Sequence, residues 1–146
     1  MNPAKRYLRY ILFLGGFFTI VFSFTWILDL TPSRLAGISW LESLFGRISP
    51  LPTDTEVGIL WLISGVFMAL AGSRASIHRP RLETAGFLFA ILMPLLMGAI
   101  FFASWMLGTS QNGYITTISY SMFTVPYFAY LFMAGDDFKP EEVDHD

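Results

Sequence analysis

The stretch that decides the fold is TAGFLFAILMPLLMGAIFFASWMLGTSQNGYITTISYSMFTVPYFAYLFMAG, residues 84–135, which contains no charged side chain. Two apolar segments, residues 85–107 and 115–134, fill most of it, and the turn-forming sequence GTSQNG separates them. About 20 apolar residues are enough for a helix to cross a hydrocarbon core about 30 Å thick. The stretch therefore predicts a hairpin of two membrane-spanning helices.

Two further apolar runs precede this hairpin and predict two more spans. Residues 10–28 and 57–73 also contain no charged side chain. Basic residues precede the first run, as in a secretory signal, but the run is longer than a signal core and ends at Asp29 rather than at a small-residue cleavage site. We therefore expect an uncleaved first span and a single membrane domain, residues 1–146. A composition of 54% apolar and only 14% charged residues agrees with this class.

The connection between the first two spans predicts an amphipathic helix over about residues 32–48. Thr31 and Pro32 suit the start of a helix, as its cap and its first residue. Apolar side chains then recur at spacings of three and four, at Leu35, Ile38, Leu41, Phe45 and Ile48. This helix is too short and too polar to cross a bilayer, so we expect it on the membrane surface or across the outer end of the bundle. The predicted fold is an all-α integral membrane four-helix bundle with this extra interfacial helix.

Basic residues predict the orientation of the spans. They gather before the first span and in the linker between the second and third, whereas only Arg34 and Arg47 lie in the connections on the opposite side. By the positive-inside rule, both termini of this multi-pass chain face the cytoplasm across the cytoplasmic (inner) membrane. Residues 136–146 hold six acidic side chains and one lysine, and form an acidic cytoplasmic tail. The four tryptophans fall near the outer interface in this scheme: Trp26, Trp40, Trp61 and Trp105.

A row of hydroxyl groups on the fourth span is the first candidate site. Its members recur at helical spacings and so share one face: Thr117, Tyr120, Ser121, Thr124 and Tyr127. We call this set the hydroxyl stripe. Two interpretations stay open: the wall of a wet pathway, or interhelical hydrogen bonds of about 0.6 kcal/mol each, which is the commoner use of such groups.

Small residues four apart predict close contacts between helices, within one chain or between subunits. These helix-packing pairs are Gly65 with Ala69, Gly86 with Ala90, and Ala99 with Ala103. Pro94 in the third span and Pro126 in the fourth each free a backbone carbonyl, and each predicts a kink.

The sequence predicts no enzyme, no cofactor and no metal site. Both histidines lie outside the spans, no ionisable aspartate, glutamate, lysine, arginine or histidine lies within them, and cysteine is absent. Arg74, Arg79 and Arg81 form a basic cluster that could contact anionic lipid head groups, or could serve only to orient the chain. The expected partners are membrane lipid and either further copies of the chain or another membrane protein. We expect no nucleic-acid partner.

Residues 57–107 also carry a family resemblance. Its features are GILWLISG at 58–65, the Arg79–Arg81 linker, AGF at 85–87 leading to Met93-Pro94, and Trp105. In this order they resemble small four-span membrane proteins of bacteriophages that infect actinobacteria. The resemblance implies a holin-like protein, judged by size and span number. Holin tails are more often basic, whereas residues 136–146 are acidic.

Two functions of different class follow. The first is a phage-type, holin-like permeabiliser that self-assembles through small-residue faces, with the hydroxyl stripe becoming wet in the assembled lesion. The second is a non-enzymatic accessory or exclusion protein that binds another membrane protein through the interfacial helix or the acidic tail.

Overall fold

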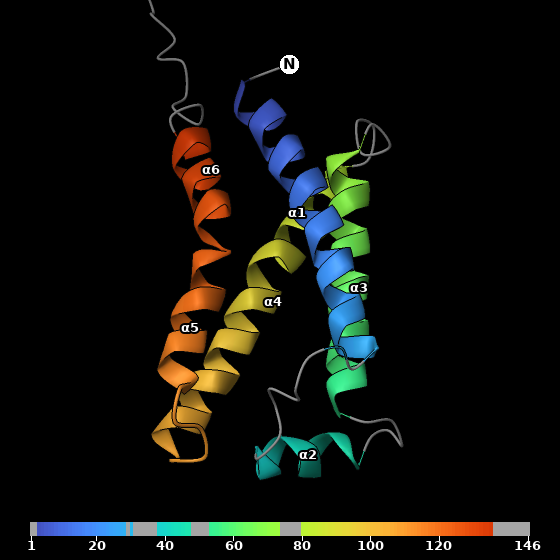
Figure 1. The fold of residues 1–146 in the computed structure, drawn as a ribbon. Coiled ribbons are helices and arrows are strands. Elements are labelled where there is room, and N and C mark those ends of the chain that lie inside the picture. The colour runs from blue at the N-terminus through green and yellow to red at the C-terminus, as the bar shows by residue number, and fades with distance from the viewer. Residues whose placement is uncertain (1–2, 29, 31–37, 48–52, 74–79, 136–146) are drawn as a thin grey trace, which may run out of the picture.

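The computed structural model of the chain describes residues 3–28, 30, 38–47, 53–73 and 80–135. Every regular element in this part of the chain is an α-helix, which confirms the all-α prediction (Figure 1). The helices are α1 Pro3–Ile27, α2 Ser39–Phe45, α3 Thr53–Gly72, α4 Pro80–Met106, α5 Gly113–Met122 and α6 Val125–Gly135. The acidic tail lies outside the described residues.

Helices α1, α3 and α4 are long and apolar enough to cross a membrane. The qualifying sections are Arg6–Ile27, Thr53–Gly72 and Arg81–Met106, where the sequence predicted spans 10–28, 57–73 and 85–107. Each helix begins before its charge-free run, because its first turns contain polar residues that lie outside the apolar segment. In α3, for example, Asp54 and Glu56 occupy the first turn, where the helix dipole favours acidic groups.

The predicted fourth span, 115–134, is divided into two helices. Helix α5 ends at Met122 and α6 begins at Val125, so neither is long enough to be a span alone. At the break the N–H of Thr124 donates to the Ser121 carbonyl at 3.0 Å, and the N–H of Tyr127 donates to the Thr124 carbonyl at 3.0 Å. Both bonds are one residue tighter than α-helical ones. Pro126, two residues later, predicts a kink in a continuous helix. It does not predict that the helix ends here.

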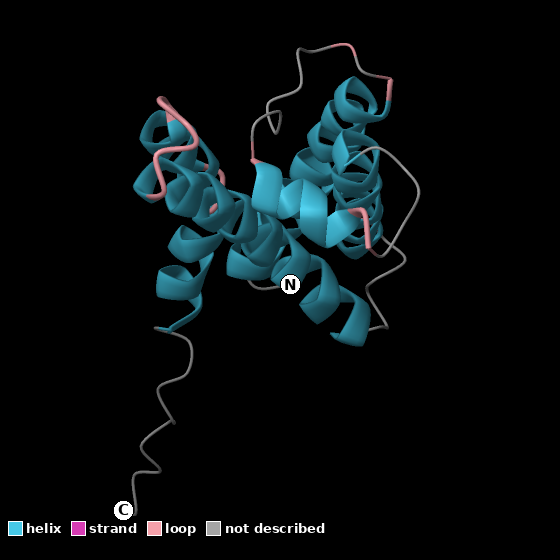
Figure 2. Ribbon diagram, turned by 90° about the horizontal axis from the view of Figure 1, so that it is seen from below, coloured by secondary structure: helices cyan, strands magenta, loops and turns pink. Residues whose placement is uncertain are grey.

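Helices α1, α3 and α4 and the α5–α6 segment run alternately down and up (Figure 1). The start of α1 and the end of α6 lie at one end of the molecule, and α2 lies across the other end. Helices α1 and α3 pack against each other along their length, α4 crosses behind them at an angle, and α5 packs on α4. Seen from the α2 end, α2 passes in front of the other helices (Figure 2). This arrangement leaves α1 and the α5–α6 segment facing each other over α4.

Glycines allow the close contact between α1 and α3. Gly58, Gly65 and Gly72 recur every two turns of α3 and all face α1, where Gly16 lies against Gly65; we call these four residues the glycine seam. A Cβ atom on Gly65 would lie 2.8 Å from the Ile20 backbone nitrogen, and one on Gly58 would lie 3.0 Å from that of Ile27. Because lipid tails are as apolar as helix side chains, such close packing is a main source of helix association in a membrane.

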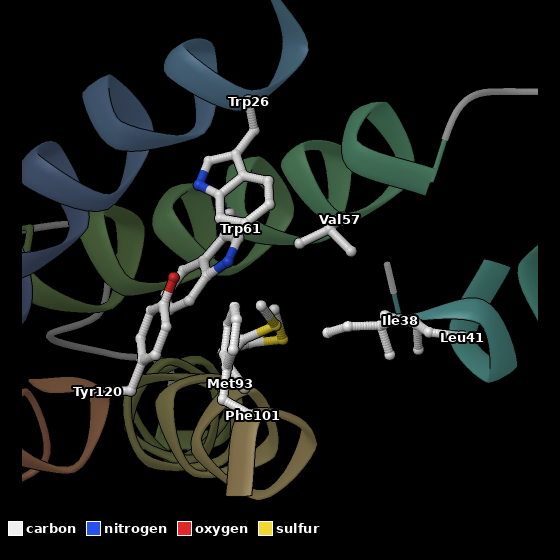
Figure 3. Close-up of a cluster of buried hydrophobic side chains, with 9 residues drawn as sticks. Trp26, Ile38, Leu41, Val57, Trp61, Met93, Phe101 and Tyr120 are labelled. Atoms are coloured by element: carbon white, nitrogen blue, oxygen red, sulfur yellow. The ribbon is translucent and has the colours of Figure 1, made fainter. Parts of the chain in front are cut away.

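Helix α2 closes one end of the molecule. Ile38, its N-cap residue, and Leu41 are buried and belong to a core cluster that also includes Val57 and Trp61 of α3 (Figure 3). On its other side, Trp40 is 37% exposed and Leu44 is 51% exposed. The sequence pattern predicts a longer helix, over residues 32–48. The structure has a helix over 39–45 and a turn at 46–47, and residues 32–37 and 48 lie outside the described part.

One ion pair joins α1 to α4 near the start of both helices. The Arg9 Nη2 and Glu83 Oε2 atoms are 3.5 Å apart, and both side chains are mostly buried. Replacing Glu83 with glutamine should lower the free energy of unfolding by about 1 kcal/mol, between the values typical of exposed and buried pairs. Thermal unfolding in detergent, followed by circular dichroism, measures this loss.

The matched control is Glu42→Gln, which makes the same change at an exposed position on α2. It should change the free energy of unfolding by less than about 0.5 kcal/mol. Equal losses for the two variants would show that the Arg9–Glu83 pair contributes nothing specific.

Candidate intramembrane cavity

A cavity of about 510 Å³ lies between α1, α3, α4 and the α5–α6 segment, within the size range of small-molecule sites. Side chains without charge line it: Ile11, Leu14, Gly15, Phe18, Thr19, Phe22, Trp61, Ser64, Met68, Phe89, Ala90, Pro94, Tyr120, Met122, Phe123, Pro126 and Tyr127. These residues come from the middle of each helix and from both sides of the α5–α6 break. The cavity is therefore at mid-depth in the bundle rather than at either end.

Irregular backbone from two helices gathers at this cavity. Pro94 and Pro126 both line it, and so do Ala90 and Met122, the residues four positions before them. Because proline has no N–H, the carbonyls of Ala90 and Met122 lack their usual helical partners. At membrane depth such backbone is tolerated only inside protein or along a cavity. The positions of both prolines agree with this constraint.

An aromatic wall forms one side of the cavity. The rings of Trp61 and Tyr120 are stacked, with centroids 5.9 Å apart, and Tyr120 stacks in turn on Phe101 at 5.8 Å (Figure 3). Phe22 of α1 meets Trp61 edge-on at 5.7 Å. Each such pair contributes about 0.5–1.5 kcal/mol beyond burial of area. This wall therefore links α1, α3, α4 and α5.

Two hydroxyl groups of the cavity wall are engaged within the protein. The Thr19 hydroxyl donates to the Gly15 carbonyl at 2.7 Å, and the Ser64 hydroxyl donates to the Phe89 carbonyl at 3.4 Å. The first bond lies within α1, and the second joins α3 to α4. Neither hydroxyl is therefore a free donor toward the cavity.

Two other polar groups belong to residues that line the cavity. Trp61 Nε1 has no acceptor within the described part of the chain and is completely covered by protein, so this N–H does not open into the cavity. The Tyr127 hydroxyl makes no hydrogen bond in the described part of the chain either. It lies against Gly15 of α1, another lining residue, where a Cβ atom would collide with it. The cavity thus has one available donor, the Tyr127 O–H.

The hydroxyl stripe faces the protein's own helices. The Thr117 hydroxyl lies 3.1 Å from the Gly98 carbonyl of α4 and 2.8 Å from a carbonyl of its own helix. Ser121 and Thr124 donate to carbonyls three or four residues earlier in the chain. The two tyrosines are buried and line the cavity, whereas the other three members do not. Among these bonds, only the one from Thr117 to Gly98 joins two helices.

The predicted helix-packing pairs lie in different surroundings. Gly65 and Ala69 pack against Gly16 of α1, and Gly86 of α4 packs against Ala71 of α3. These close approaches join α1 to α3 and α3 to α4. The small-residue pattern predicted close contacts either within one chain or between subunits, and these contacts lie within one chain.

The remaining small residues lie on α4. Ala90 is buried and lines the cavity. Ala99 is exposed and Ala103 is half-buried, one turn apart. This last pair is therefore open, at least at Ala99, to contact from outside the chain.

The basic cluster is described only in part. Arg81 is exposed in the first turn of α4, whereas Arg74 and Arg79 lie outside the described residues. Within the described ranges, no group of three or more histidine, aspartate or glutamate side chains could hold a metal ion.

Sequence reasoning missed the cavity and the role of Trp61. The four tryptophans differ in burial, since Trp26 and Trp61 are buried in the core cluster whereas Trp40 and Trp105 are partly exposed. Their position near the outer interface stays a prediction. The available signal was the pair of prolines near mid-span in two different helices. No protein-family model, no curated protein and no solved structure matches the chain.

Proposed function

We propose that the chain crosses the membrane four times, with α5 and α6 together forming the fourth crossing. Residues 113–135 would span about 35 Å at 1.5 Å per residue, enough for a hydrocarbon core of about 30 Å. In support, α5 starts beside the end of α4, and α6 ends at the level where α1 starts (Figure 1). The basic residues before the first span place both termini on the cytoplasmic side in this proposal.

The proposed activity is that of a non-enzymatic accessory protein that binds another membrane protein. The observation that supports it is that α2 has apolar side chains on two faces, one packed on the bundle and one exposed. Ile38 and Leu41 fix α2 across the end of the bundle, while Trp40 and Leu44 point apolar surface outward. A short helix packed against the bundle in this way can present side chains to a partner at low entropic cost. Aromatic side chains are also enriched at protein interfaces.

A photo-crosslinking amino acid at position 44 tests this proposal in living bacteria. We expect a discrete adduct with one membrane protein, sustained growth, and loss of the same partner from co-purification when Leu44 is replaced by aspartate. The control position is Leu92, a lipid-facing residue of α4. Adducts with lipid alone, or the same protein captured from both positions, would contradict partner binding through α2.

Holin-like self-assembly is the second candidate, and the outward-facing Ala99 with Ala103 favours it. Such a pair lets helices of two copies approach closely. The interior position of the hydroxyl stripe weighs against it, because α5 and α6 would have to leave their neighbours before the stripe could line water. Induced expression with a membrane-potential dye separates the two functions. An abrupt, timed collapse that Ala99→Phe abolishes supports the holin-like function, and a steady potential supports the accessory function.

A further inference from the structure

We propose that the intramembrane cavity is a binding site for a neutral, mostly hydrocarbon molecule that carries a carbonyl or ether oxygen and enters from the lipid phase. This ligand site is separate from α2 and goes beyond the proposed accessory function. It can be correct even if no protein partner binds.

The lining of the cavity requires a neutral ligand. No lining side chain carries a charge, so nothing in the wall compensates the cost of a charged group, about 2.5–3.5 kcal/mol at mid-membrane. The volume of about 510 Å³ suits a small ligand rather than a helix, whose diameter alone is about 10 Å.

The route of entry is lateral. Two lining residues of α1, Leu14 and Phe18, are also exposed on the outer surface of the protein. They lie in the middle of α1, more than two turns from either of its ends. A molecule that reaches the cavity past them therefore comes from the hydrocarbon region and not from water.

The Tyr127 hydroxyl identifies the polar part of the ligand. It makes no hydrogen bond within the described part of the chain and lies beside Gly15 on the wall of an otherwise largely apolar cavity, where a donor without an acceptor is costly. A ligand oxygen that accepts from this hydroxyl removes the cost. Packing holds the ring in place, because Phe87 contacts Tyr127 edge-on at 6.3 Å.

The depth of this donor separates the ligand from an ordinary phospholipid. Tyr127 lies just past the α5–α6 break, near the middle of the proposed fourth crossing. The ester oxygens of a phospholipid stay near the membrane surface, about 15 Å from the centre of a core about 30 Å thick. Its tails alone reach the cavity and have no acceptor. The ligand must therefore be neutral enough to carry its oxygen into the bilayer interior.

Photolabelling of the purified full chain with benzophenone, a neutral aromatic ketone that reacts at its carbonyl, tests the proposal. Peptide mass spectrometry gives the ratio of label on cavity-lining residues to label on the outward surface of α1 and α4. Because partitioning of benzophenone into detergent affects both labels equally, the ratio does not depend on it. Fluorenone should displace the cavity label better than fluorene, which has the same shape without the carbonyl. Equal displacement by both compounds would overturn the role of the acceptor.

Two variants make the test more specific. Tyr127→Phe removes the donor and should lower the cavity label about fivefold while leaving the outward label unchanged, as expected for one hydrogen bond. Leu14→Trp, at a lining position 36% exposed, should fill the cavity and abolish its label.

The matched control for filling is Phe13→Trp, one residue away, 49% exposed and not part of the cavity wall. It should leave the cavity label intact. Cavity label no stronger than outward label in the wild-type protein would overturn the site. The comparison of fluorenone with fluorene uses no variant, so it remains decisive if a substitution prevents folding.

Discussion

Replacing Gly16 with alanine is expected to destabilise the folded protein by about 2 kcal/mol or more. The added methyl group would lie 2.7 Å from the Gly65 carbonyl oxygen and 2.9 Å from the Ala69 Cα atom, and closer still to the Ala69 backbone nitrogen. Backbone atoms cannot turn aside as a flexible side chain does, so α1 and α3 must separate along the glycine seam. Reversible unfolding in mixed detergent micelles measures the loss.

The control is Gly98→Ala in α4, the same chemical change at another buried helical glycine. A Cβ atom on Gly98 would lie 3.6 Å or more from its nearest neighbours, which is ordinary van der Waals contact. Because alanine favours a helix by about 1 kcal/mol over glycine, this variant should be neutral or stabilising. The prediction fails if the Gly16 and Gly98 variants lose stability to the same extent.

The three helices that are long and apolar enough to cross a membrane could be predicted because lipid imposes a simple requirement on such helices. A charge-free run of sufficient length satisfies that requirement whatever the neighbours are. The Gly65–Ala69 pair was predictable for a related reason, since small residues on one helix face permit close packing. The sequence could not show that Gly16 of α1 would be the group opposite, because that depends on the register between the two helices.

The division of the fourth predicted span shows where such reasoning ends. Pro126 indicated a kink, but the site of the break depends on the tighter backbone bonds around Thr124. The cavity depends on contacts among four segments that are distant in the chain. Its two prolines were visible in the sequence as separate kinks. The folded structure shows in addition that Pro94 and Pro126 line the same cavity.

Replacing Trp61 with alanine should lower the free energy of unfolding by about 3 kcal/mol. The indole joins α3 to α1 through Phe22 and to α5 through Tyr120, so its loss removes two aromatic contacts and leaves a void. Hydrophobic transfer contributes little in lipid, but the lost packing contacts remain costly. The same unfolding experiment in mixed micelles measures this effect.

Trp40→Ala is the control for this substitution, because Trp40 is partly exposed on α2 and lies outside the core cluster. Its loss should change the free energy of unfolding by less than about 1 kcal/mol. Trp61→Phe should recover most of the stability lost in Trp61→Ala, since a phenyl ring can still pack against Phe22 and Tyr120. Equal stabilities for the alanine and phenylalanine variants at position 61 would mean that the aromatic wall does not join these helices.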